Sequence, residues 1–181
     1  MANNLPPELQ SWLNDFRQIK LPVWQDFPKF DIYMDQLVSL VNQYLAPFEL
    51  DPVTPAMINN YVKHKVMFKP VKKKYQRTHL AAVIVLSILK TAFPLDMIRL
   101  GFAQELNAVT AQEAYDRFVR LMTQKLTALT LEQPVQPVET ATVFSWDAAI
   151  QQTAATTVIY QLVSEKIMIL AREEYKNDPK D

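Results

Sequence analysis

Residues 54–90 read TPAMINNYVKHKVMFKPVKKKYQRTHLAAVIVLSILK. The opening threonine and proline are typical of an N-cap followed by proline at the first helical position, and they predict a short helix over residues 55–64. Residues 66–76 mix β-branched and aromatic side chains with lysines, which predicts a small ribbon or an irregular loop. A nearly continuous apolar run then predicts a helix that starts at about residue 76 or 78 and ends near residue 91.

Positive charge is concentrated in this same stretch. Residues 52–95 contain eight basic side chains and no acidic one, and seven of the eight lie between Lys63 and Arg77. The flanking segments, 1–51 and 96–181, are each acidic, so the 181-residue chain has a formal net charge of zero. Because a patch of one sign attracts polyanions, this distribution of charge favours an anion-binding face, although the net charge of the chain is zero.

The order of elements around the basic stretch indicates a winged helix-turn-helix. Apolar residues that recur at i, i+3, i+4 and i+7 predict a helix over residues 33–48, which we expect Asp31 to cap. A break at residues 51–53, the short helix, the basic loop and a further helix complete the order. In such motifs the second helix enters the major groove and the wing contacts phosphate. The candidate DNA-binding residues are Asn59, Asn60, Tyr61, Lys63, His64, Lys69, Lys72, Lys73, Lys74, Tyr75 and Arg77.

The quoted stretch and the upstream segment LPVWQDFPKFDIYMDQL closely resemble the bacterial domain-of-unknown-function family 1836, over most of the chain up to about Leu106. The elements MINNYVK and KKKY are specific to the resemblance. The resemblance implies a regulator, because this region of the family is similar to the MerR winged-helix transcription factors. In that comparison Ile58, Tyr61 and Lys63 fall on the recognition helix, Pro70 and Tyr75 on the wing, and residues 93–98 on the start of the fourth helix. MerR proteins carry Arg-Tyr at the positions of Asn59 and Asn60, so no base preference is carried over.

The remaining chain also has helical character, and we expect an all-α protein with a MerR-like winged helix-turn-helix, a small basic wing and a C-terminal helical part. Thr110 and Glu113 form a capping-box pattern before a helix that ends near Leu129. Residues 131–142 carry two prolines and read as a linker, after which Ser145 is expected to cap one long helix over residues 145–176. We predict three regions: an N-terminal helix and connector over 1–30, the winged helix-turn-helix over 31–106, and a dimerisation or sensing region over 107–181.

Several function classes conflict with the composition. The single glycine rules out phosphate loops, Rossmann turns and nucleophile elbows, and the absence of cysteine rules out disulfides and thiolate metal sites. Neither of the two histidines has a carboxylate nearby in sequence, so we expect no catalytic residue, metal or cofactor, and no enzyme. No export signal or membrane span is recognised, which predicts a cytoplasmic protein without a membrane role.

These observations predict a transcriptional regulator that binds double-stranded DNA, with residues 55–64 in the major groove and residues 66–77 on phosphates. The helical remainder is interpreted as a dimerisation or sensing part, because one short helix reads too few bases for genomic specificity. The helix over residues 145–176 is the candidate homodimer contact, and the oligomeric state stays open. The alternative is a protein-interaction module whose basic face docks an acidic partner and whose apolar C-terminal helix packs on another chain. The operator, any effector ligand and the choice between activation and repression stay open.

Overall fold

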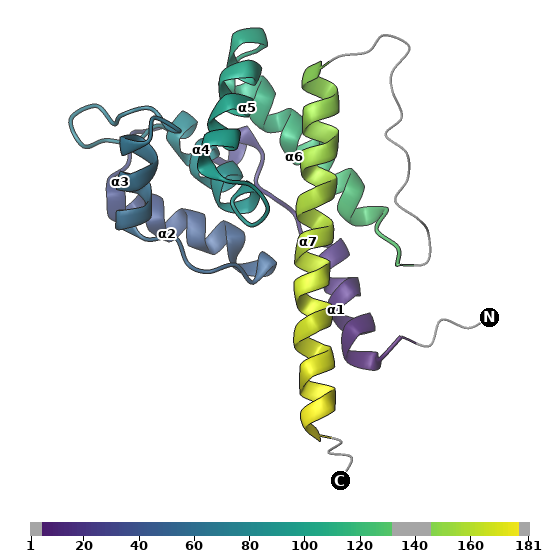
Figure 1. The fold of residues 1–181 in the computed structure, drawn as a ribbon. Helices are drawn as coiled ribbons and strands as arrows, with labels where there is room; N and C mark the ends of the chain where they lie inside the picture. The colour runs from purple at the N-terminus through teal and green to yellow at the C-terminus, as the bar shows by residue number, and fades with distance from the viewer. Residues whose placement is uncertain (1–4, 132–145, 178–181) are drawn as a thin grey trace.

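The protein is described by a computed structural model that covers residues 5–131 and 146–177 (Figure 1). Within these residues the fold is all-α, as predicted, and no strand is present. Two short 3₁₀ helices, η1 and η2, accompany the α-helices. The elements are α1 (Pro7–Arg17), η1 (Trp24–Asp26), α2 (Met34–Leu45), η2 (Ala46–Phe48), α3 (Pro55–Lys63), α4 (Arg77–Leu89), α5 (Leu95–Ala108), α6 (Ala111–Thr127) and α7 (Trp146–Asn177).

Helix α4 lies at the centre of the fold. Apolar residues surround it on nearly all sides, so it has no polar face to present to solvent. Its residues Val83, Ile84, Leu86 and Ile88 are completely buried. The helix packs against α2 on one side and against α6 and α7 on the other, and it therefore joins the N-terminal helices to the C-terminal ones.

The connector between α1 and α2 is attached to α6 by aromatic residues and two hydrogen bonds. The rings of Trp24, Phe27 and Tyr115 lie 5.1 to 6.3 Å apart between centroids. The Tyr115 hydroxyl donates to the Pro22 carbonyl oxygen at 2.8 Å, and the Trp24 backbone N–H donates to an Asp116 carboxylate oxygen at 3.1 Å. These contacts bring the start of α2 next to the body of the molecule.

Of the three predicted helix caps that lie within the described residues, two are confirmed. The Thr54 hydroxyl accepts the Met57 N–H at 3.3 Å, and Thr110 and Glu113 form the reciprocal capping box at the start of α6. The prediction for α2 is wrong, because the side chain of Gln36 folds back to accept the backbone N–H of Tyr33 at 2.9 Å. Asp31 lies further out along the chain and does not cap the helix.

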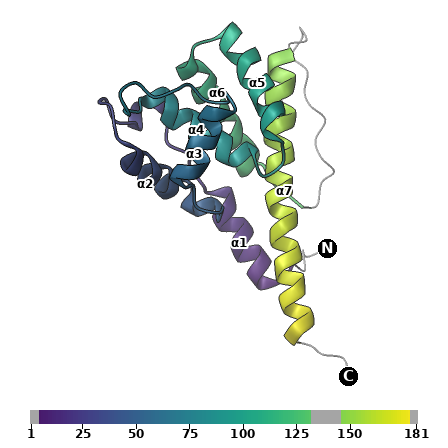
Figure 2. The ribbon, with the colours of Figure 1, turned by 60° about the vertical axis from the view of Figure 1, so that its left-hand side comes forward.

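The longest helix, α7, crosses α1, α4, α5 and α6 and extends beyond α1 at its C-terminal end (Figures 1 and 2). Its buried stripe consists of Ala155, Val158, Ile159, Leu162 and Val163. Buried residues from α1 to α7 form one hydrophobic cluster, so the predicted regions 1–30, 31–106 and 107–181 share a core, and their division stays a prediction. Ser145 and residues 132–142 of the predicted linker lie outside the described residues.

Candidate nucleic-acid interface

The position of α3 relative to α2 is set by one asparagine. The side chain of Asn42 accepts the Val53 N–H at 2.7 Å and donates to the Val53 carbonyl oxygen at 3.0 Å. Both bonds are partly buried, and they hold the extended segment that enters α3 against α2. The turn between the two helices is therefore attached at the point where α3 begins.

We expect Asn42→Ala to lower the free energy of unfolding by about 1–3 kcal/mol, because both backbone groups of Val53 lose a partly buried partner. Chemical denaturation measures the loss. Asn42→Asp is the informative comparison, because aspartate retains the acceptor for the Val53 N–H and loses the donor to the Val53 carbonyl. An alanine variant as stable as the wild type would show that this turn does not depend on Asn42.

Helix α3 has one buried face and one exposed polar face. Ile58 and Tyr61 are almost completely buried, which fixes the rotation of the helix. The opposite side presents Asn59, Asn60 and Lys63 to solvent, and His64 continues this face at the C-cap. Four side chains predicted to meet DNA therefore lie together on one exposed surface.

The C-terminus of α3 is a Schellman motif with lysine where glycine is usual. Lys65 adopts a left-handed backbone with φ of 56°. Its N–H bonds to the Val62 carbonyl at 3.1 Å, and the Val66 N–H bonds to the Tyr61 carbonyl at 3.0 Å, which is the bond pattern of the motif. A left-handed conformation disfavours any side chain with a Cβ, so Lys65 destabilises the turn that it forms.

Lys65→Gly is expected to raise the free energy of unfolding by about 1 kcal/mol, because glycine relieves the left-handed strain at this position. Thermal or chemical denaturation measures the gain. Lys63→Gly is the control, since that residue is helical and should lose about 1 kcal/mol. A Lys65→Gly variant that is less stable than the wild type would contradict the claim that the left-handed backbone of Lys65 destabilises the fold.

The loop between α3 and α4, residues 65–76, is called the basic loop below. Its tip is a two-residue turn in which the Lys74 N–H bonds to the Val71 carbonyl at 2.9 Å. The two central residues, Lys72 and Lys73, have φ of 50° and 61°. Positive φ at both central positions defines a type I′ turn, where Asn-Gly is the favoured pair. The tip thus holds two lysines in a conformation that their side chains disfavour.

The base of the basic loop is anchored to the connector and to α4. Tyr75 and Ile32 exchange both backbone hydrogen bonds, at 2.8 and 2.9 Å, as in one rung of an antiparallel ribbon. The buried His79 accepts the Gln76 N–H on Nδ1 at 2.9 Å and packs edge-on against the Tyr75 ring at 5.5 Å. Of the two predicted alternatives, a small ribbon or an irregular loop, the structure has a loop with one isolated bridge at its tip and one at its base.

Burial lowers the pKa of His79 below its ordinary value, with the Gln76 N–H held by the neutral ring. Because the unfolded state takes up the proton at higher pH than the folded state, stability is expected to fall as the pH drops below about 6.5. The measurement is the free energy of unfolding from pH 7.5 to 5, compared with His79→Asn, whose amide oxygen replaces Nδ1 as acceptor. If the free energy of unfolding fell equally steeply with pH in both proteins, His79 would not be the group responsible.

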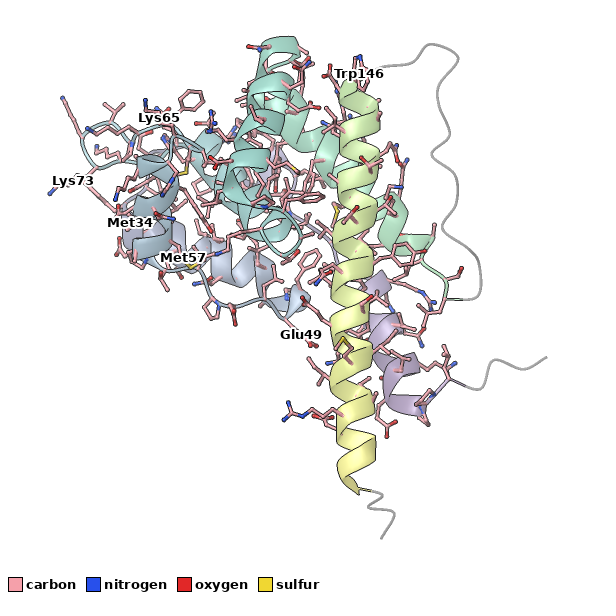
Figure 3. The ribbon with its side chains drawn as sticks, viewed as in Figure 1. Met34, Glu49, Met57, Lys65, Lys73 and Trp146 are labelled. Atoms are coloured by element: carbon pink, nitrogen blue, oxygen red, sulfur yellow. The ribbon has the colours of Figure 1, made fainter. Side chains whose placement is uncertain are left out.

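The exposed lysines of α3 and the basic loop face solvent without acidic partners. In residues 5–131 and 146–173, the three ion pairs join Arg99 to Asp96, Arg117 to Glu105, and Lys166 to Glu49. None involves the segment from Lys63 to Arg77, whose exposed cations are Lys63, Lys65, Lys69, Lys72, Lys73 and Lys74. Lys65 and Lys73 both lie at the end of the molecule farthest from α7 (Figure 3), and Figure 2 shows α2 and α3 in the foreground.

Residues 22–118 match the family model described as Domain of unknown function (DUF1836), which covers more than half of the 181 residues. The chain belongs to the DUF1836 family. The matched region includes most of the connector, α2 to α5 and the first half of α6. It therefore contains all six exposed lysines between Lys63 and Lys74, which are called the basic surface below. Comparison with curated proteins and with solved structures gives no match.

Three residues of the DUF1836 region that were predicted to contact DNA have structural positions instead. Tyr61 and Tyr75 are 1% and 4% exposed, and burial raises the pKa of both phenols. Arg77 donates to the carbonyl oxygens of Pro28 at 3.0 Å and Phe27 at 3.1 Å. The tyrosine side chains are enclosed, and the Arg77 guanidinium is held by the connector. We therefore remove all three from the candidate contacts.

The remaining eight predicted residues of the DUF1836 region are not buried, and the structure adds Lys65 to them. These eight are Asn59, Asn60, Lys63, His64, Lys69, Lys72, Lys73 and Lys74. Lys65 belongs to the same acid-free stretch, and its charge was visible in the sequence. Asn42 is a further addition, as a positioning residue for α3, and no local pattern indicates its contact with Val53.

Helix α7 lies outside the DUF1836 match and exposes apolar side chains near its C-terminal end, among them Met168 and Ile169. Within Trp146–Glu173 an 18-residue window reaches a mean hydropathy of 1.2, so the helix is long and apolar enough to cross a membrane, a test that core helices of soluble proteins also pass. Residues of that window pack on α4, α5 and α6 in this structure. The absence of a membrane role stays a prediction, as does the cytoplasmic location.

The described residues contain no group of three histidine, aspartate or glutamate side chains placed to hold a metal ion. Among them, the carboxylate of Glu105 has both oxygens buried; burial raises its pKa, and the Arg117 guanidinium lies 3.7 Å away. This pair lies between α5 and α6, away from the basic surface. The expectation that the protein is not an enzyme stays a prediction.

Proposed function

We propose that the protein is a DNA-binding transcriptional regulator in which α3 enters the major groove and the basic loop contacts phosphates. The observation that carries the proposal is the surface of six lysines without acidic partners among the described residues. Such a surface attracts a polyanion, and it includes a capped helix whose polar face is free of core contacts.

The left-handed backbone at three of these lysines supports a functional role for their positive charge. Lys65, Lys72 and Lys73 occupy left-handed positions that glycine would occupy more easily. The one glycine, Gly101, lies inside α5, where a Cβ would meet nothing within 4 Å. Strain that is retained in the native state is typical of functional sites. Positive charge at these three positions is thus kept at a cost in stability.

The exposed face of α3 has side chains suited to reading bases. Asn59 and Asn60 are able to pair with the N6 and N7 edge of adenine, and Lys63 with guanine or phosphate. The basic loop lies directly after this helix and takes the place of a wing, so the proposed arrangement is a MerR-like winged helix-turn-helix. The single turn and two isolated bridges make this wing shorter than a full hairpin.

We further propose that the regulator works as a homodimer through α7. A recognition helix of nine residues contacts few base pairs, and two copies would double the site. The C-terminal part of α7 exposes Ile167, Met168 and Ile169, which a second copy would cover. No effector ligand is proposed.

The second candidate function is a protein-interaction module in which the basic surface docks an acidic partner protein. The exposed apolar end of α7 favours it, since that surface would pack against another chain without any DNA. Under this alternative the lysines would contact carboxylates, and the polar face of α3 would read no bases.

Selection from a pool of random duplexes separates the two candidates. Repeated capture by the full-length protein is expected to enrich one motif, and the bound fragments should show two half-sites about 10 base pairs apart if the dimer forms. A pool that stays random after several rounds, together with weak binding at about 0.15 M salt, would overturn the regulator and favour the interaction module.

A further inference from the structure

The basic loop carries two large apolar side chains that its lysines do not explain. Phe68 is 70% exposed and Val71 is 68% exposed. Neither belongs to the hydrophobic cluster or packs against it, whereas Val66 and Met67 of the same loop are buried. A single exposed apolar residue is ordinary, but here two lie in one short loop among Lys69, Lys72 and the two lysines after it.

The loop backbone holds these two side chains away from the core. At one end the N–H groups of Val66 and Met67 bond to the Tyr61 carbonyl, and at the other end Tyr75 pairs with Ile32. Val71 supplies the carbonyl that closes the turn at the tip, and the proline immediately before it restricts φ. Phe68 and Val71 are therefore presented by an anchored loop, and little ordering is needed when a partner covers them.

The chemistry of the loop indicates the kind of partner. The other exposed aromatic residues among the described ones, Phe30, Tyr33 and Trp146, each lie within two residues of an aspartate, which would repel phosphates. Phe68 and Val71 lie in the stretch that lacks acidic residues. Proteins that bind the minor groove combine cationic side chains with apolar wedges that insert between stacked base pairs and bend the duplex.

We propose that Phe68 and Val71 form an apolar wedge that enters the minor groove beside the site of α3, partly unstacks one base step and bends the DNA. This inference rests on the proposed function and adds to it a deformation of the duplex. The lysines around the wedge neutralise the phosphates that the bend brings together. A flexible TA step is the favoured target, because it unstacks more easily than a stiff A-tract.

The test uses the full-length protein and duplexes of about 30 base pairs that carry central TA steps and a fluorescent donor and acceptor at their ends. Binding by the wild type is expected to raise energy transfer as the ends approach, and to brighten 2-aminopurine at the central step. Phe68→Ala is expected to lose most of both signals and about tenfold in affinity, while the salt dependence stays unchanged because every lysine remains. An A-tract duplex of equal length is expected to bind more weakly.

Phe30→Ala is the matched control, because Phe30 is also 70% exposed and lies outside the basic loop. It is expected to bend the duplex as the wild type does. Duplex binding by the wild type without added energy transfer, or with transfer that survives in Phe68→Ala, overturns the wedge and leaves the regulator standing. Absence of duplex binding by the wild type overturns both.

Two further binding measurements test whether the basic loop binds single-stranded nucleic acid or a membrane surface instead. Tighter binding to a single-stranded oligonucleotide than to the duplex, abolished in Phe68→Ala, would assign the ring to base stacking and overturn the wedge. Binding to phosphatidylserine vesicles that needs Phe68, without duplex binding, would assign the loop to a membrane surface and overturn it equally.

Discussion

Replacing Lys72, Lys73 and Lys74 together by alanine is expected to weaken duplex binding about a hundredfold near 0.1 M salt. The same variant should lower the slope of log affinity against log salt concentration by up to about 3, one for each phosphate that is no longer neutralised. The physical reason is that each lysine releases counterions from the DNA when it neutralises a phosphate. Fluorescence anisotropy at several salt concentrations measures both quantities.

The matched control is the triple variant Lys20→Ala, Arg99→Ala and Arg120→Ala, which removes the same charge from exposed positions outside the basic stretch. It is expected to shift affinity only slightly and to leave the slope unchanged. Because all three loop lysines are exposed, both variants should unfold at nearly the wild-type temperature. A loop variant that binds duplex as tightly as the control would contradict the phosphate contacts.

Leu86→Ala is expected to lower the free energy of unfolding by about 2–5 kcal/mol, and the melting temperature by about 5–15 °C. Leu86 is completely buried in α4, and its truncation leaves a cavity where this helix joins α2 to α6 and α7. Chemical denaturation followed by circular dichroism measures the loss.

Leu86→Met is the companion variant, because it nearly conserves volume and should cost less than about 1.5 kcal/mol. The contrast between the two substitutions isolates the cavity from any change in local helix preference. A Leu86→Ala variant within about 1 kcal/mol of the wild type would contradict the central position of α4.

The sequence predicted the elements of this fold where the signals were local. The nearly continuous apolar run of α4 indicated a buried helix, and Thr54 and Thr110 marked helix starts through their own hydrogen bonds. The exposed polar face of α3 was also predicted, and Asn59, Asn60 and Lys63 are exposed there. Local periodicity therefore carried most of the architecture.

The candidate site was predicted less completely, because several of its contacts join distant residues. Arg77 counted as a phosphate contact by its charge, yet the fold brings the carbonyls of Pro28 and Phe27 to its guanidinium. Tyr61 and Tyr75 were assigned to DNA although their rings fill the core. The left-handed backbone of Lys65, Lys72 and Lys73 was not predicted either, because lysine rarely adopts this conformation.

The most direct test of the proposed interface is a titration of the ¹⁵N-labelled protein with a duplex, followed through its amide resonances. We predict that the largest shifts fall on Asn59, Asn60, Lys63 and residues 65–74, and that they weaken with added salt. Amides of α5 and of the first half of α7 should change little. Shifts confined to α7, or no shift at a high excess of duplex, would contradict a DNA-binding surface on α3 and the basic loop.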